Sequence, residues 1–249
     1  MRKIVLASLA MLLLVCFGPR ASAQEEIQAI INKAVKAHGG AEKLNKLKCV
    51  QSKSKGKLEL LGGVDFTQEV SAKYSGKFKE VLEMEIMGNK VKVTTAFDGT
   101  KGWISANGTL MDANDKILEE LKEASYGMKV ARLANILNDK SLHLSALGQS
   151  KVEGRPAVGV KIASEGHRDI DLYFDKESGL LVKVEGRKHD FQTMQEVTEE
   201  RIITEYQEVD GQKTAKKVLV NRDGKKFMEV EVTEAKFLDD IDDSEFKKP

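Results

Sequence analysis

Residues 116–137 read KILEELKEASYGMKVARLANIL and place apolar side chains at the spacing of an α-helix. Ile117, Leu118 and Leu121 fall on one face of that helix, and charged residues lie opposite. The residues on either side of the stretch instead alternate between apolar and polar, with the period of two that is typical of strands. The sequence therefore predicts a helical insertion, at about residues 112–138, in a chain that is otherwise mainly β.

The insertion is predicted to contain two helices separated by Gly127. In the second, at about residues 128–138, the polar residues Lys129, Arg132 and Asn135 follow one another every three positions and form a narrow stripe. Apolar side chains take the rest of the circumference. A helix of this kind needs apolar partners on most of its sides.

The strands around the insertion show the pattern of an antiparallel sheet. Alternation is clear at 82–86 (LEMEI), 170–174 (IDLYF) and 229–232 (EVEV). Turn signals such as Asp98-Gly99 recur at intervals of about 9–14 residues, which is the spacing of hairpins in a meander. Each strand then has one dry and one wet face. The predicted fold class is mainly β (α+β).

The N-terminus resembles a secretory signal peptide. Two basic residues precede an apolar run at 4–17, which is short for a bilayer span. Small residues at 21–23 then match a cleavage site. Residues 1–23 are expected to be removed on export to the periplasm, leaving 24–249 as a single domain. An uncleaved anchor, or a lipid attached to Cys16, stays open as an alternative.

Loss of this leader leaves a nearly neutral chain. The 40 Lys and Arg fall to 37, against 39 Asp and Glu. Such a mixed surface argues against nucleic acid as a partner. No later stretch reaches about eighteen apolar residues, so no transmembrane segment is expected after cleavage. Cys49 would be the one cysteine left. The first element of the remaining chain is predicted to be a helix at 25–37, ended by Gly39 and Gly40.

The residue types that carry catalysis or bind metals form no recognisable pattern. The four histidines lack the spacing of metal ligands, so neither a metal nor another cofactor is predicted. His167-Arg168-Asp169 matches one kinase motif, but the other kinase motifs are missing from the sequence. We therefore expect no enzymatic activity, with an unfamiliar catalytic site as the remaining alternative.

One hairpin, FDGTKGW at 97–103, carries two aromatic side chains on adjacent strands. Phe97 and Trp103 either form a cross-strand pair or line an apolar pocket. Both interpretations stay open at this point.

Together these elements resemble a known family. The segments that carry the resemblance are HGGAEKL (38–44), FDGTKGW (97–103), LYFDKESGLLVK (172–183), EYQEVDGQK (205–213) and IDDSEFKKP (241–249). In this order, after a signal peptide and an N-terminal helix, they look like the outer-membrane lipoprotein-sorting family of LolA- and LolB-like periplasmic carriers. The resemblance covers essentially the whole chain after the leader, through soft patterns of turns and aromatic residues.

The resemblance implies an incomplete antiparallel β-barrel of about ten or eleven strands around a hydrophobic cavity, with the helical insertion as its lid. It also implies a soluble carrier that binds the acyl chains of lipids or lipoproteins and exchanges them with a membrane-anchored donor or acceptor. A lid that only plugs the barrel, and an envelope sensor or scaffold that binds a lipid or peptide signal, are the alternatives. Arg132 is the candidate polar contact of the lid. The candidates for the cavity lining are Leu82, Met84, Ile86, Val91, Val93, Phe97, Trp103, Leu118, Leu121, Met128, Leu133, Ile136 and Leu137.

Overall fold

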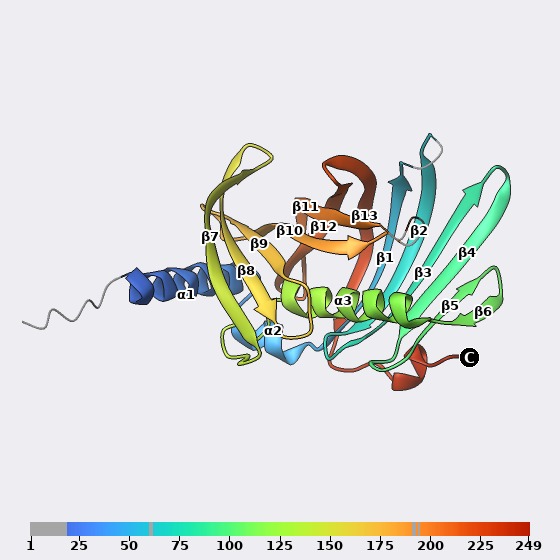
Figure 1. Cartoon of the computed structure of the whole chain (residues 1–249), viewed down its shortest axis with the longest axis horizontal. Coiled ribbons are helices and arrows are strands. Elements are labelled where there is room, and N and C mark those ends of the chain that lie inside the picture. The colour runs from blue at the N-terminus through green and yellow to red at the C-terminus, as the bar shows by residue number, and fades with distance from the viewer. Residues whose placement is uncertain (1–18, 60–61, 191–192, 194) are drawn as a thin grey trace, which may run out of the picture.

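A computed structural model describes residues 19–59, 62–190, 193 and 195–249. These residues form one antiparallel sheet of thirteen strands, which is not closed into a barrel (Figure 1). Hydrogen-bonded neighbours follow the order β6-β5-β4-β3-β2-β1-β13-β12-β11-β10-β9-β8-β7. The strands are β1 (Cys49–Leu58), β2 (Val64–Lys73), β3 (Lys77–Ile86), β4 (Asn89–Phe97), β5 (Gly102–Ala106), β6 (Thr109–Asp112), β7 (Leu142–Val152), β8 (Arg155–Ser164), β9 (Ile170–Asp175), β10 (Leu181–His189), β11 (Glu196–Val209), β12 (Gln212–Arg222) and β13 (Lys225–Leu238).

The predicted incomplete antiparallel barrel is thus confirmed, with thirteen strands where about ten or eleven were expected. Three α-helices accompany the sheet in the described residues: α1 (Pro19–Ala37), α2 (Ala41–Lys46) and α3 (Asp115–Ala131). A 3-10 helix, η1 (Asp243–Phe246), lies near the C-terminus. Within the described residues, none of the helices is both long enough and apolar enough to cross a membrane.

Helix α1 ends as its sequence predicts. Gly39 and Gly40 have φ values of 115° and 91°, the left-handed region that glycine adopts readily. The helix begins at Pro19 and so includes residues 19–23 of the predicted leader, whereas residues 1–18 lie outside the described part of the chain. Cleavage before Gln24 stays a prediction.

Helix α3 connects the two edges of the sheet. Every neighbouring pair of strands except β1 and β13 is consecutive in the chain, and the two edge strands are β6 and β7. The segment between β6 and β7 contains α3, whose 17 residues span about 25 Å. Figure 1 shows α3 running from the β5–β6 side of the sheet towards β8. The helical insertion is therefore the bridge over the gap that the open sheet leaves.

The insertion contains one helix, and the second predicted helix at 128–138 is wrong. Helix α3 continues through Gly127, because the roughly 1 kcal/mol cost of an interior glycine is small beside the packing on both sides of it. It ends at Ala131, and the left-handed residues Leu133 (φ 60°) and Asn135 (φ 53°) stop it from continuing. The apolar side chains that follow belong to a turn that is buried in the core.

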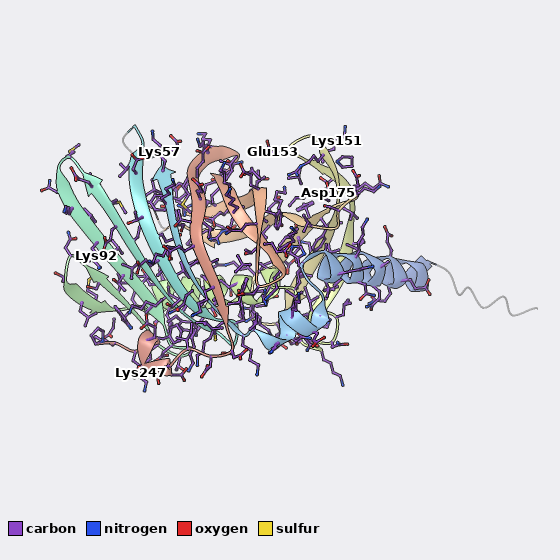
Figure 2. The ribbon with its side chains drawn as sticks, turned by 180° about the vertical axis from the view of Figure 1, so that it is seen from behind. Lys57, Lys92, Lys151, Glu153, Asp175 and Lys247 are labelled. Atoms are coloured by element: carbon purple, nitrogen blue, oxygen red, sulfur yellow. The ribbon has the colours of Figure 1, made fainter. Side chains whose placement is uncertain are left out.

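The sheet has two different faces, and we call the one that α3 packs on the inner face. On β1 the outer-face residues Gln51, Lys53, Lys55 and Lys57 are exposed, whereas the inner-face residue Leu58 is buried. Lysine side chains continue over the outer face, where Lys57 and Lys92 are labelled in Figure 2. On β1 and β4 the outside of the curved sheet is thus a polar surface.

The inner face is filled at one end of the sheet. The side chains of β7–β9 that point inwards pack with α1 and with the turn after α3 in one large hydrophobic core. Val160, Ile162 and Leu172 have no exposed surface there. We call the inner face of β7–β9 the packed half, and the inner face of β1–β4 the open half.

Candidate functional site

Helix α3 rests on the sheet along two sides. On one side it contacts β4 and β5, where Leu121 packs with Phe78 and Phe97. Gly102 allows this approach, since a Cβ atom at Gly102 would lie 2.3 Å from Cδ1 of Leu121. On the other side the helix contacts β10. The helix therefore spans from one wall of the curved sheet to the other.

Charged groups hold the β10 side of α3. The buried carboxylate of Glu120 lies 2.7 Å from Nη1 of Arg168 and 2.8 Å from Nδ1 of His189. The backbone N–H of Arg168 donates to Glu123 over 2.9 Å, and Nδ1 of His167 lies 2.9 Å from the same carboxylate. The stretch at 167–169 that resembles a kinase motif therefore anchors α3 to the turn between β8 and β9.

The same cluster contains potential metal ligands. Ligand atoms of Glu119, Glu120 and His189 lie within 4.8 Å of one another. The guanidinium of Arg168 already lies among them, 2.5 Å from Glu119, 2.7 Å from Glu120 and 3.2 Å from Nδ1 of His189. A cation is thus supplied by the chain itself, and the arrangement fits an anchor better than a metal centre.

Arg132 fixes the C-terminal end of the helix. Its Nη2 donates to the carbonyl oxygens of Leu44 and Leu47 over 3.4 Å and 3.3 Å. The guanidinium carbon lies 5.1 Å from the ring centroid of Tyr74 and 4.7 Å from that of Phe237. Burial lowers the pKa of Arg132 below its usual range. Arg132 thus joins the end of α3 to the residues after α2 and to the ends of β2 and β13, and its role as a polar contact of a lid stays a prediction.

Between its two anchored sides, α3 presents an apolar stripe. On a helical wheel, where successive residues are 100° apart, this stripe lies in the arc between Glu120 and Leu121. It consists of Ile117, Ala124, Met128 and Ala131. Ile117, Met128 and Ala131 are half-buried and Ala124 is exposed. Because both flanks of the arc touch the walls of the sheet, this stripe faces its middle strands. Its exposure shows that those strands do not pack tightly against it.

Five of the predicted lining residues lie together on the open half. Leu82 pairs with Val93 and Met84 with Val91 across β3 and β4, so their side chains share a face. Phe78 and Phe97 belong to the same face and contact α3, which identifies it as the inner one. The five residues are all half-buried: Leu82, Met84, Ile86, Val91 and Val93.

Trp103 is not on this face, and its prediction as a lining residue is wrong. The turn at 98–101 pairs Phe97 with Gly102 and Ala96 with Trp103. Successive residues of a strand point to opposite faces, so Trp103 points outwards. There it is buried, and its Nε1 donates to the backbone oxygen of Phe246 over 3.1 Å.

The predicted lid residues divide between two cores. Leu118, Leu121 and Met128 pack beside Phe97 on the open side of the sheet. Leu133 and Ile136 are 1% and 3% exposed within the large core of the packed half, with Leu137 packed against it. These three side chains support the lid from the side, because the second helix that would have carried them over a cavity does not form.

A charged cluster that was not predicted from the sequence lies on the inner face of β10–β12. Glu199 is 7% exposed and lies 3.0 Å from Nε of Arg201, 3.1 Å from Nε of Arg222 and 3.3 Å from Nζ of Lys188. Burial would raise the pKa of Glu199, but these three cations outweigh it and lower the pKa to about 2. Charged residues at positions i and i+2 of a strand were the available signal, and such pairs are common in this chain.

The exposure of Arg201 indicates that the core does not fill the inner face of β11. Arg201 pairs with Val184, which packs against the large core, so both side chains lie on the inner face. Half of the Arg201 side chain is nevertheless open to solvent. We call the space that is left unfilled beside Arg201, the open half and the apolar stripe of α3 the hollow.

A polar chain lies on the opposite wall of the hollow. Oγ of the buried Ser54 donates to Gln68 over 2.9 Å, and the amide of Gln68 donates to Glu80 over 2.5 Å. The charge of Glu80 acts on Arg201 through space. The walls of the hollow are therefore apolar in large part, with polar groups at defined places.

Two pockets lie outside the hollow. One, of about 300 Å³, lies between α3 and the turns at Ser75-Gly76 and Gly99, and Phe97 is the one predicted lining residue in its wall. The other, of about 610 Å³, is a wide depression beside α2, lined by Glu42, Asn45, Lys46, Lys48 and Asp239. Neither combines the apolar surfaces of the open half and of α3.

Comparison with known proteins gives matches of structure alone. No family model matches the chain, and no curated protein matches its sequence. A LolA superfamily protein from Nitrosomonas europaea is similar with a TM-score of 0.57 and 9% identity, over 89% of this chain and 97% of the other. A DUF1329 family protein from Desulfovibrio piger has a TM-score of 0.54 and 12% identity, over 89% and 97%.

A third solved structure bears directly on the resemblance seen in the sequence. It is a domain described as a putative outer membrane lipoprotein-sorting protein from Vibrio parahaemolyticus, with a TM-score of 0.53 and 9% identity, over 89% of this chain and 96% of that one. These structural similarities span most of both chains in each comparison, while the sequence identity is very low, so they establish the fold. The chain has the fold of LolA-superfamily and lipoprotein-sorting proteins.

Proposed function

We propose that this protein is an exported carrier, without enzymatic activity, that binds acyl chains of lipids or lipoproteins in the hollow between the open half and α3. The observation that carries the proposal is the half-buried state of the inner face of β3 and β4. Leu82, Met84 and Val93 are apolar and face inwards, yet they are not packed as a core. The apolar stripe of α3 faces the same space.

The chemistry of such a site follows from its lining. Each methylene removed from water is worth roughly 0.8 kcal/mol, so ten buried methylenes of an acyl chain contribute about 8 kcal/mol before the cost of ordering the chain. Burial is not directional, and the flexible side chains of Met84 and Met128 adapt to chains of different shape. We therefore expect high tolerance for chain length and branching.

The lid sets how cargo enters and leaves. Helix α3 is held by Arg168 on its β10 side and by Arg132 at its C-terminal end. Release then needs no nucleotide or cofactor. It needs a shift of the lid and transfer of the chain to a membrane-anchored donor or acceptor protein. The likeness in fold to a lipoprotein-sorting domain supports this type of transfer, at the level of fold.

A direct test is to look for bound lipid and to disturb the hollow. Native mass spectrometry of gently purified protein is expected to show co-purifying lipid. Leu82→Glu puts a charge on the inner face and is expected to abolish both this lipid and the binding of a fluorescent fatty acid. Thr67→Glu puts the same charge on the exposed outer face of the neighbouring strand and is expected to leave binding unchanged.

The outcomes separate the carrier from its alternatives. Lipid that stays bound, together with a stable complex with a membrane protein and no lipid transfer between vesicles, would favour a sensor or scaffold. Equal behaviour of the Leu82→Glu and Thr67→Glu variants, in proteins that both fold, would remove the inner face from the site and overturn the proposal.

A further inference from the structure

A charged cluster inside an apolar hollow needs a physical reason. When an acyl chain fills the hollow, water leaves, and charges near the chain lose hydration. Lys188, Arg201 and Arg222 bring three positive charges to the cluster, and Glu199 and Asp190 bring two negative charges. Among these five residues, cations exceed carboxylates by one.

That excess charge is most accessible at Arg201. Arg222 is 17% exposed and lies 2.6 Å from Asp190 through Nη1 and 3.1 Å from Glu199 through Nε, so its fork is engaged by protein carboxylates. Arg201 is 50% exposed and meets Glu199 through Nε. Because this contact uses Nε, the two terminal nitrogens of the guanidinium can donate two parallel hydrogen bonds to an oxyanion.

Apolar side chains flank Arg201 on the same face. In the register of the sheet it lies beside Val184 on β10 and Val220 on β12, and Val220 lies beside Met228 on β13. From Met228 the inner face continues through Leu58 to the open half. Of these side chains, Val220 and Leu58 are already buried, whereas Val184 and Met228 are half-buried and can contact the apolar chain of a molecule whose anionic end is at Arg201.

We propose that Arg201 binds the anionic headgroup of the cargo, a carboxylate or a phosphate. This proposal rests on the proposed carrier function. Glu199 orients the guanidinium and keeps it in one place. Glu80 on the opposite wall repels an anion, so the headgroup binds on the β10–β12 wall and the chain points towards the open half. The carrier thus selects amphipathic anionic lipids over neutral ones.

The test compares two fluorescent probes that differ only in charge. Cis-parinaric acid has a carboxylate, and its methyl ester has the same chain without the charge. Wild-type protein is expected to bind the acid at least about tenfold more tightly than the ester, the effect of a charge-assisted hydrogen bond. Arg201→Gln is expected to lose this preference while it binds the ester as wild type does.

Two further variants serve as controls. Arg187→Gln removes an arginine from the outer face of the same sheet, where it also pairs with a glutamate, and is expected to keep the preference. Arg201→Lys keeps a positive charge and is expected to retain part of it. Displacement of bound parinarate by hexadecyl phosphate or by palmitate then shows which of the two oxyanions binds more tightly.

The possible results are distinct. If wild type binds acid and ester equally, or if Arg201→Gln keeps the full preference, the headgroup site is overturned while the carrier function stands. If wild type binds neither probe and carries no lipid, the proposed function itself fails. A preference that is lost in Arg201→Gln and kept in Arg187→Gln supports the site.

Discussion

On β8 and β9 the inner-face residues Val160, Ile162 and Leu172 have no exposed surface, whereas on β3 and β4 the inner-face residues Leu82 and Val93 are half-buried. Residues of both sets, such as Leu172 and Val93, alternate with polar neighbours in the sequence. The first set is covered by α1 and by the turn after α3, and it forms the largest core of the protein. The second set faces the hollow beneath α3.

The difference shows that alternation reports the face of a residue and not what covers that face. A strand with apolar inner residues can support a core or line a ligand site. Which of these occurs depends on the elements packed on the sheet, and here these are α1 at one end and the bridging helix above the middle. Substitutions of the same type in the two halves should therefore have different consequences.

The largest effect is expected in the packed half. Leu172→Ala removes a fully buried side chain between α1 and α3 and is expected to lower the free energy of unfolding by about 2–5 kcal/mol. Urea denaturation followed by circular dichroism measures this loss. A loss below about 1 kcal/mol would mean that the packed half can collapse around the missing atoms, and it would remove the contrast between the halves.

The next effect concerns the border between the halves, where Glu199 lies. Its pKa is lowered to about 2 from an ordinary value of 4.5. Its contribution to stability is therefore fully present above about pH 4.5 and is lost as the pH falls towards about 2. The shift corresponds to about 3 kcal/mol of folding free energy.

Unfolding measured in urea from pH 5 to pH 2 tests this, with Glu199→Gln as the comparison. Wild type is expected to lose about 3 kcal/mol more than the variant over this interval. Asp139 and Asp243 also have pKa values lowered to about 2, and they titrate in both proteins, so the difference isolates Glu199. Parallel curves for the two proteins would show that the cations do not hold Glu199 ionised.

A smaller effect is expected at the anchor between α3 and β10. Arg168→Gln leaves the buried carboxylate of Glu120 without its guanidinium partner and is expected to cost about 1–3 kcal/mol. The loss should appear as faster hydrogen exchange of the α3 amides, because the helix opens locally. The double variant with Glu120→Gln should recover part of the loss, since a neutral amide is cheaper to bury.

An exposed ion pair provides the control for this anchor. Arg187→Gln breaks the contact of Arg187 with Glu196, whose side chains are 69% and 48% exposed, and is expected to change stability by less than about 1 kcal/mol. If α3 exchanged no faster in Arg168→Gln than in Arg187→Gln, the helix would be held mainly by apolar contacts such as those of Leu121, and the charged anchor would be dispensable.

Much of the fold could be predicted from local patterns. Alternation at 82–86 and 170–174 identifies strands, Gly39-Gly40 ends α1, and the helical insertion is visible because its period differs from that of its surroundings. The inner-face position of Leu82 and Val93 also follows from alternation, because their pairing partners alternate in the same phase.

The rest depends on information that a local pattern does not contain. Trp103 points outwards because the turn at 98–101 pairs Phe97 with Gly102, whereas both interpretations of the sequence placed Phe97 and Trp103 on the same face. Leu133 and Ile136 are apolar at helical spacing, but two left-handed residues end the helix before they reach a lining position. Glu199 gains its role from Arg222, which lies on another strand.

A small effect on stability is expected in the open half, and it completes the comparison with Leu172. Leu82→Ala makes the same chemical change on the same face of the same sheet. Because Leu82 is half-buried, it is expected to lower the free energy of unfolding by only about 1 kcal/mol. It should instead weaken the binding of a fluorescent fatty acid by about fivefold, the effect of losing roughly 1 kcal/mol of apolar contact.

The two leucine substitutions are thus expected to have opposite effects on stability and on affinity. Leu172→Ala is expected to change stability far more than affinity, at temperatures where the variant stays folded, and Leu82→Ala to do the reverse. If Leu82→Ala cost as much stability as Leu172→Ala and left fatty-acid binding unchanged, the open half would be an ordinary core. The hollow would then have no apolar wall to hold an acyl chain, because the same side chains cannot both fill a core and line a binding site.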